Sequence, residues 1–149
     1  MAYSTAVSRD IAAPPEKVWA LVADLPRMGE WSPENEGGKW VKGASGPAVG
    51  AVFRGHNKNG LRRWSTSVTV VECEPGKAFE FAVSSGPLTV ANWRYDFEQT
   101  ATGCRVTESW RDTRKPWFAR VARVMGEHSA ATAEKQMDAT LTRLAAAVE

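Results

Sequence analysis

The sequence predicts an α+β fold in which one curved antiparallel sheet wraps around a long C-terminal helix. From residue 38 to residue 112, apolar and polar residues alternate in successive segments joined by short turns, a pattern typical of antiparallel strands. After that region the apolar residues recur at helical spacing, and a long amphipathic helix needs an apolar surface on which to lie. Because helices and strands are segregated along the chain, the class is α+β, and the sheet must curl to cover the helix.

A strand and two short helices are expected at the start of the chain. The strand covers residues 3–12, where apolar and polar residues alternate until Pro14 and Pro15 interrupt the ladder. These prolines suit the first turn of a helix, where the N–H groups lack partners, and apolar residues continue at helical spacing from Val18. A second short helix is expected over residues 25–29.

Six further strands are expected in the middle of the chain, separated by turn residues. Asn59-Gly60 is a type I′ hairpin signal between the second and third of them. The expected strands cover residues 39–43, 50–57, 61–73, 78–85, 88–100 and 104–113.

The C-terminal segment predicts one long helix. Its apolar residues trace a single stripe from Phe118 to Val148, with Gly126 inside the pattern as a point where the helix can bend. At about 1.5 Å per residue, such a helix would be about 48 Å long. The helix is therefore longer than a small domain needs for itself.

Composition and charge favour a single globular domain over residues 1–149. The chain has 149 residues, of which 43% are hydrophobic and 24% charged, and its seven tryptophans favour an aromatic cavity or interface. A formal net charge of +2 is too small to drive nucleic-acid binding, which needs a concentrated basic face. We therefore expect no nucleic-acid partner. The sequence leaves the oligomeric state open between monomer and homodimer.

The N-terminal residues lack the basic and apolar regions of a signal peptide, and no apolar run approaches the ~18 residues of a membrane span. The expected location is cytoplasmic, so Cys73 and Cys104 are expected to be reduced. Their spacing matches no metal or redox motif, and we expect no metal and no cofactor.

Strand periodicity predicts an aromatic inner face. Side chains two residues apart share a face, so Trp93 and Tyr95 point the same way while Arg94 points outward. Methionine suits an irregular apolar wall, and Met125 of the long helix would close the space. These residues line a ligand cavity or simply pack as a core. The candidate wall residues are Phe53, Trp64, Phe81, Trp93, Tyr95, Trp110 and Met125.

Glu108 is the candidate catalytic residue. It shares a face with Val106 and Trp110, which places its carboxylate in an apolar cavity if Val106 is in the core. A buried carboxylate is paired, protonated or functional. A bulge that turns Glu108 outward, or an ion pair with an arginine, are the alternatives. His128, one helical turn beyond Met125, is a further cavity candidate, whereas His56 is expected to face solvent.

Residues 111–123 form the one concentrated basic segment, in which four arginines and a lysine alternate with Trp117 and Phe118. A basic amphipathic stretch of this kind can approach an acidic membrane surface, which would give a weak membrane contact. The alternative is a solvated helix start whose Trp117 and Phe118 pack on the sheet.

Several segments resemble the START-like superfamily, also called SRPBCC, in its polyketide cyclase/dehydrase and lipid-transport group. The resemblance covers essentially the whole chain and implies a helix-grip fold, with a seven-stranded sheet and an internal pocket for an apolar or aromatic ligand. Members share a cavity rather than a catalytic motif. The matching segments are "AAPPEKVWALVADLPRMGEWSP" (residues 12–33), "VTVVECEPGKAFEF" (68–81), "WRYDFE" (93–98) and "TGCRVTES" (102–109).

The resemblance also gives a place to Met28 and Trp31. It implies that the segment after the first helix lies at the open end of the sheet, facing the long helix. Met28 and Trp31 would then stand at the pocket rim, with Trp31 either a lid over the ligand or a plug in the core.

The expected function is binding of a hydrophobic small molecule, such as a lipid, a polyketide or an aromatic metabolite, between the sheet and the C-terminal helix. One alternative is an enzyme of the polyketide cyclase or dehydratase type that uses Glu108, with Tyr95 or His128 nearby. A second alternative is a regulatory or toxin-like protein that acts through a protein partner.

Overall fold

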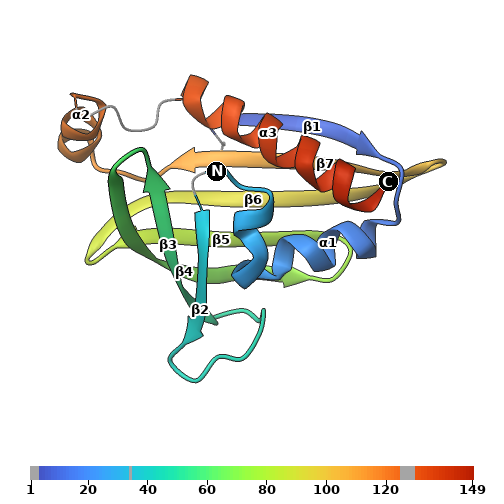
Figure 1. Ribbon diagram of the computed structural model, residues 1–149, viewed down its shortest axis with the longest axis horizontal. Helices are drawn as coiled ribbons and strands as arrows, with labels where there is room; N and C mark the ends of the chain where they lie inside the picture. The colour runs from blue at the N-terminus through green and yellow to red at the C-terminus, as the bar shows by residue number, and fades with distance from the viewer. Residues whose placement is uncertain (1–3, 34, 125–129) are drawn as a thin grey trace.

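The computed structural model describes residues 4–33, 35–124 and 130–149 and has the predicted helix-grip architecture (Figure 1). Seven antiparallel strands form one sheet in the order β1-β7-β6-β5-β4-β3-β2, so every sequential pair except β1 and β2 is adjacent. The strands are β1 (Thr5–Ile11), β2 (Asn35–Val41), β3 (Val52–Asn59), β4 (Arg62–Glu74), β5 (Ala78–Ser85), β6 (Leu88–Thr100) and β7 (Gly103–Asp112). The helices are α1 (Pro15–Ala23), the 3₁₀ helix η1 (Leu25–Glu30), α2 (Pro116–Val124) and α3 (Ala130–Val148).

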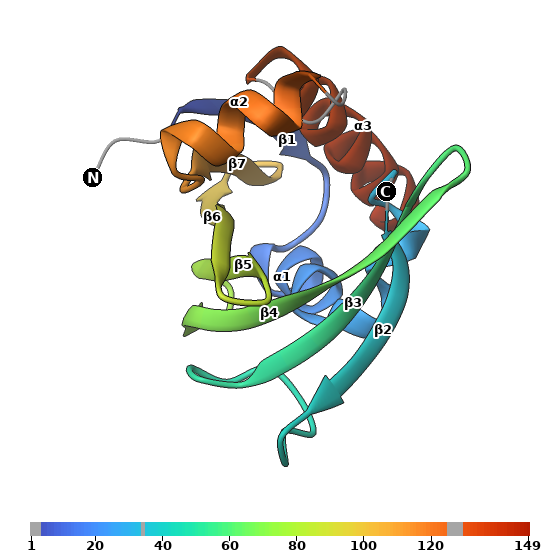
Figure 2. The ribbon, with the colours of Figure 1, turned by 90° about the vertical axis from the view of Figure 1, so that its left-hand side faces the viewer.

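The C-terminal region differs from the prediction of one continuous helix. Two separate helices, α2 and α3, occupy it, and their axes run in different directions (Figures 1 and 2). The 19 residues of α3 give it a length of about 28 Å, which lets it lie along the sheet within the domain. A helix continuing through α2 would extend past the end of the sheet without a surface to cover. Gly126 lies outside the described residues.

Glycines explain where two strand predictions were inaccurate. β2 begins at Asn35 rather than at residue 39, because Gly38, with φ +153°, lies at a register shift against β3 and lets the strand continue through it. In the β3–β4 hairpin, Asn59 pairs with Arg62. The two loop residues are therefore Gly60, with φ +64°, and Leu61, instead of Asn59 and Gly60.

The outer face of the sheet carries the polar side chains that strand periodicity placed there. Arg94 contacts Glu72 and lies 3.1 Å from the carboxylate of Glu80 and 2.9 Å from that of Asp96. These charges satisfy one another on the face of β4, β5 and β6 that points away from α3.

Closed packing fills one end of the space between the sheet and α3. This core lies where α1 closes the sheet, and Trp19 of α1 donates a hydrogen bond from Nε1 to the carbonyl of Ala78 (2.9 Å). The other end of the same space is only partly filled, by a second buried cluster that includes Trp110 and Met137, and the remaining space forms the cavity described below. The fully buried core side chains include Val18, Val22, Leu25, Phe79, Val106, Leu141 and Leu144.

Candidate functional site

A cavity of about 360 Å³ lies between the sheet and α3, at the end of the molecule opposite α1. Its volume is within the usual range of small-molecule sites, about 300–1,000 Å³. Strand periodicity correctly places most of the aromatic side chains around it. The predicted residues that line it are Met28, Trp64, Phe81, Trp93, Tyr95, Glu108 and Trp110.

The aromatic wall follows from strand register. Phe81, Trp93 and Trp110 lie at paired positions on β5, β6 and β7, so their side chains form one row across the inner face of the sheet. The rings of Trp93 and Trp110 are 6.3 Å apart between centroids and tilted by 45°. Such a row presents a flat apolar surface with few degrees of freedom to the cavity.

Glu108 lies in this wall with one oxygen unpaired. It pairs with Tyr95 in the β6–β7 register, and the Tyr95 hydroxyl donates a hydrogen bond of 2.8 Å to Oε2. Oε1 has no hydrogen-bond partner among the residues that the structure describes. The side chain is only 3% exposed and lines the cavity, and in the part of the chain that the structure describes it forms no ion pair with an arginine.

Burial in the apolar wall raises the pKa of Glu108 to about 8, and the hydrogen bond from Tyr95 offsets part of that rise. Burial, reinforced by the neighbouring Glu108, raises the pKa of the Tyr95 hydroxyl well above its usual range. Both groups are therefore protonated at neutral pH. With the Tyr95 hydroxyl donating to Oε2, the proton of Glu108 sits on Oε1 and can be donated to a ligand in the cavity.

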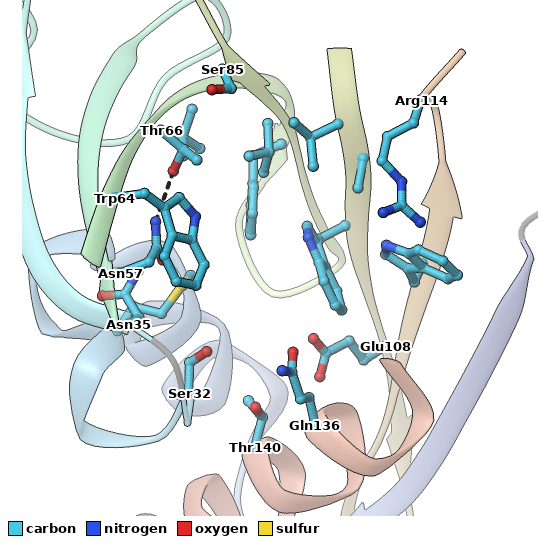
Figure 3. Close-up of a pocket in the computed structure, with 18 of the residues that line it drawn as sticks. Ser32, Asn35, Asn57, Trp64, Thr66, Ser85, Glu108, Arg114, Gln136 and Thr140 are labelled. Carbon is cyan, nitrogen blue, oxygen red and sulfur yellow. Dashed lines mark hydrogen bonds between the residues drawn. The ribbon is translucent and has the colours of Figure 1, made fainter. Parts of the chain in front are cut away.

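Two sets of polar side chains complete the lining and were not among the predicted site residues. Gln136 and Thr140 of α3 face the cavity, and Gln136 and Glu108 point toward one another (Figure 3). On the other side, the Asn57 amide donates a hydrogen bond of 3.1 Å to the Thr66 hydroxyl. Periodicity carried the signal in both places, since Asn57 lies two residues from a buried glycine and Gln136 lies four residues before Thr140. The remaining polar lining includes Ser32 and Asn35.

Trp31 and Phe53 do not line the cavity, contrary to the prediction. Trp31 is 2% exposed in the closed core, because η1 turns the chain so that Met28 and Ser32 face the cavity instead. Phe53 is 1% exposed and packs edge-on against Trp40 of β2, with ring centroids 5.4 Å apart. Trp31 is thus buried in the way that the plug hypothesis required.

Of the two histidines, His56 is exposed on β3 as expected, where its Nδ1 lies 3.1 Å from the Ser65 hydroxyl. The predicted cavity residues Met125 and His128 lie outside the described residues.

The basic segment divides into an anchored part and an exposed part. Arg114 lines the cavity, and its guanidinium donates to the Asp112 carboxylate from Nε (2.9 Å) and from Nη2 (2.8 Å). Trp117 on α2 is 57% exposed, so the expectation that it packs on the sheet is wrong. The reason is that α2 lies beyond the end of β7 rather than over the sheet (Figure 1).

Within residues 4–33, 35–124 and 130–149, no three His, Cys, Asp or Glu side chains gather as metal ligands. In the same residues, no helix has the length and apolar character needed to cross a bilayer.

A curved sheet that grips a helix and leaves an internal cavity defines a helix-grip protein. The family model described as polyketide cyclase/dehydrase and lipid transport matches residues 3–149, and the chain belongs to this family. None of the curated proteins matches the chain.

Several solved structures are similar to this chain. A polyketide-cyclase-like protein from Corynebacterium glutamicum is 36% identical, with a TM-score of 0.56 over 95% of this chain and 84% of that one. The protein CV1439 from Chromobacterium violaceum is 15% identical, with a TM-score of 0.73 over 99% of both chains. The di-domain aromatase/cyclase StfQ of the steffimycin biosynthetic pathway is 14% identical, with a TM-score of 0.73 over 95% of this chain and 49% of that one. The last two similarities show the fold alone.

Proposed function

We propose that this protein binds a flat aromatic molecule that carries an oxygen acceptor, and that Glu108 donates a hydrogen bond to that acceptor. The observation that carries the proposal is Glu108 Oε1, which is buried, has no partner among the described residues and faces an aromatic cavity. A buried polar atom without a partner is costly unless a ligand satisfies it.

The rest of the wall supports the same class of ligand. Phe81, Trp93 and Trp110 offer apolar surface for an aromatic body, while Gln136 and Thr140 add polar groups near Glu108. The family description names polyketide cyclases and lipid transport, and StfQ is an aromatase/cyclase. Aromatic polyketides combine fused rings with carbonyl and phenol oxygens, so they meet both requirements of the cavity.

A matched pair of ligands tests the proposal by calorimetry. Acetonaphthone and ethylnaphthalene have nearly the same shape, but only the ketone has an oxygen that accepts a hydrogen bond. Because the pKa of Glu108 is about 8, the carboxyl is a donor at about pH 6 and an acceptor at about pH 9.5. We expect the ketone to bind up to about tenfold more weakly at the higher pH, and the hydrocarbon to bind equally at both.

The Glu108→Gln variant is the control, because its amide keeps a donor but does not titrate. It should bind the ketone with the same affinity at both pH values. If the wild type bound neither acetonaphthone nor ethylnaphthalene, the binding function would be contradicted. If the affinities for the ketone and the hydrocarbon changed equally with pH, only the role of Glu108 would be contradicted, and the binding function would stand.

The second candidate function is a dehydratase or cyclase activity, favoured by the Tyr95–Glu108 pair in the wall. On a β-hydroxy ketone, Glu108 would protonate the departing hydroxyl as its C–O bond breaks and water leaves. The carboxylate would then take the proton from the neighbouring carbon as the C=C bond forms, which regenerates the acid. Loss of one water from a naphthyl β-hydroxy ketone, followed by mass spectrometry, tests this. Glu108→Gln should bind this ketone but not convert it.

A further inference from the structure

Two segments far apart in sequence flank the mouth of the cavity. Arg62, at the tip of the β3–β4 hairpin, and Val121, on α2, both line the cavity. Figure 1 shows the hairpin tip and α2 at the same end of the molecule, and Figure 2, which looks at that end, shows them on opposite sides of it. A surface that contacts both the hairpin tip and α2 would therefore also cover the entrance to the cavity.

Both segments expose large apolar side chains. Leu61 at the hairpin tip is fully exposed, Trp117 on α2 is 57% exposed, and Val121 is 52% exposed. In the described part of the chain only two other large apolar side chains are exposed, Val49 and Val71. Exposed apolar residues are thus concentrated where the cavity opens.

The same segments are basic and contain no acidic residue. Lys58 and Arg63 flank the hairpin tip, Lys115 and Arg120 lie on or beside α2, and all four are exposed. No Asp or Glu occurs between residues 37 and 71 or between residues 113 and 126, although the whole chain carries 17. A net charge of only +2 therefore conceals a strongly positive end.

We propose that this end of the molecule docks on an anionic lipid bilayer. We call it the mouth face and define it by Lys58, Leu61 and Arg63 on the hairpin and by Lys115, Trp117 and Arg120 at α2. Basic side chains are attracted to anionic headgroups, and Trp and Leu partition into the interface just below them. The exposed apolar residues lie on two separate segments, each of which also contributes a residue to the cavity lining. A bilayer accepts side chains at any lateral position, whereas an acidic protein would have to match this spacing.

Docking in this way would turn the cavity entrance toward the membrane. A hydrophobic ligand would then move between bilayer and cavity without crossing water. This consequence rests on the proposed ligand-binding function, whereas docking itself rests only on the exposed residues and their charge.

Vesicle co-sedimentation tests the docking. We expect the wild type to sediment about fivefold more with vesicles of phosphatidylcholine and phosphatidylglycerol than with phosphatidylcholine alone, and less as salt is added. A Leu61→Ser/Trp117→Ser variant should lose most of the binding because it removes the inserted side chains. A Lys58→Gln/Arg63→Gln/Lys115→Gln variant should lose the preference for anionic vesicles.

Matched controls come from elsewhere on the surface. Val49→Ser removes a side chain that is 69% exposed between β2 and β3, and Lys77→Gln removes a charge at the β4–β5 turn; both should bind vesicles like the wild type. None of the substituted residues lines the cavity, so acetonaphthone binding without vesicles should be unchanged in every variant. Failure of the wild type to bind anionic vesicles, or equal loss in the controls, would overturn the docking. Binding to an acidic protein but not to vesicles would also overturn it.

Discussion

Glu108 is a buried carboxyl group whose ionisation costs the folded protein stability. Its pKa of about 8 lies above the ordinary value of 4.5 because burial disfavours the charged form. A carboxyl whose pKa is raised by folding binds its proton more tightly in the folded state. Its contribution to stability is therefore complete below about pH 4.5 and is lost as the pH rises to about 8. The role proposed for Glu108, which requires a neutral acid, would account for this cost.

The Glu108→Gln variant makes this cost measurable. The free energy of unfolding of the wild type should fall by roughly 3–5 kcal/mol, relative to that of Glu108→Gln, between pH 4.5 and pH 8. Other titrating groups contribute equally to both proteins and cancel in the difference. Urea unfolding across this pH range measures it. A constant difference between the two proteins would show that Glu108 is not held neutral by the fold.

At the scale of elements, the positions and faces of the strands were largely predictable. The limits of β5 and β6 were predicted exactly as the structure has them, and the outward side of β6, with Arg94, was predicted correctly. Alternation determines faces because it depends only on local backbone geometry. Register shifts were not predictable, because they depend on which residues meet across two strands.

Gly38 is one such position and provides a test at this scale. A Cβ at residue 38 would lie 2.0 Å from the carbonyl oxygen of Arg54 and 2.8 Å from the ring of Phe53, and its φ of +153° disfavours other residues. Gly38→Ala should lower the free energy of unfolding by about 2 kcal/mol or more, because the β2–β3 pairing must shift. Thermal or urea unfolding checks this.

Gly46, in the loop between β2 and β3, is the matched control. A Cβ there meets nothing within 4 Å. Gly46→Ala should therefore change stability by no more than about 0.5 kcal/mol. Equal effects of the two substitutions would contradict the close approach of β2 and β3 at Gly38.

At the scale of the whole molecule, the space between the sheet and α3 is divided into a closed core beside α1 and a cavity at the opposite end. Trp31 belongs to the core, with 2% of its surface exposed, and Trp64 belongs to the cavity wall, where it is half-buried. The same residue type therefore packs in the core at one end and lines the cavity at the other.

Substituting each tryptophan tests this division. Trp31→Ala should lower the free energy of unfolding by about 3–5 kcal/mol, since it empties a packed site, and should leave acetonaphthone affinity unchanged at temperatures where the variant is folded. Trp64→Ala should cost less stability and weaken the ligand by about tenfold. Urea unfolding and calorimetry separate the two effects. The reverse pattern would make Trp31 a lid rather than a plug.

The sequence by itself determined the α+β class, the seven strands, the inward aromatic residues and the unusual position of Glu108. Each of these depends on the local periodicity of strand or helix, which short-range geometry imposes. Tertiary structure alone decided that α2 and α3 are separate, and that Trp31 and Phe53 are core residues rather than cavity residues. It also brought the β3–β4 hairpin and α2 to one end of the molecule. These features depend on which elements meet in space, and periodicity within a single element carries no information about its neighbours.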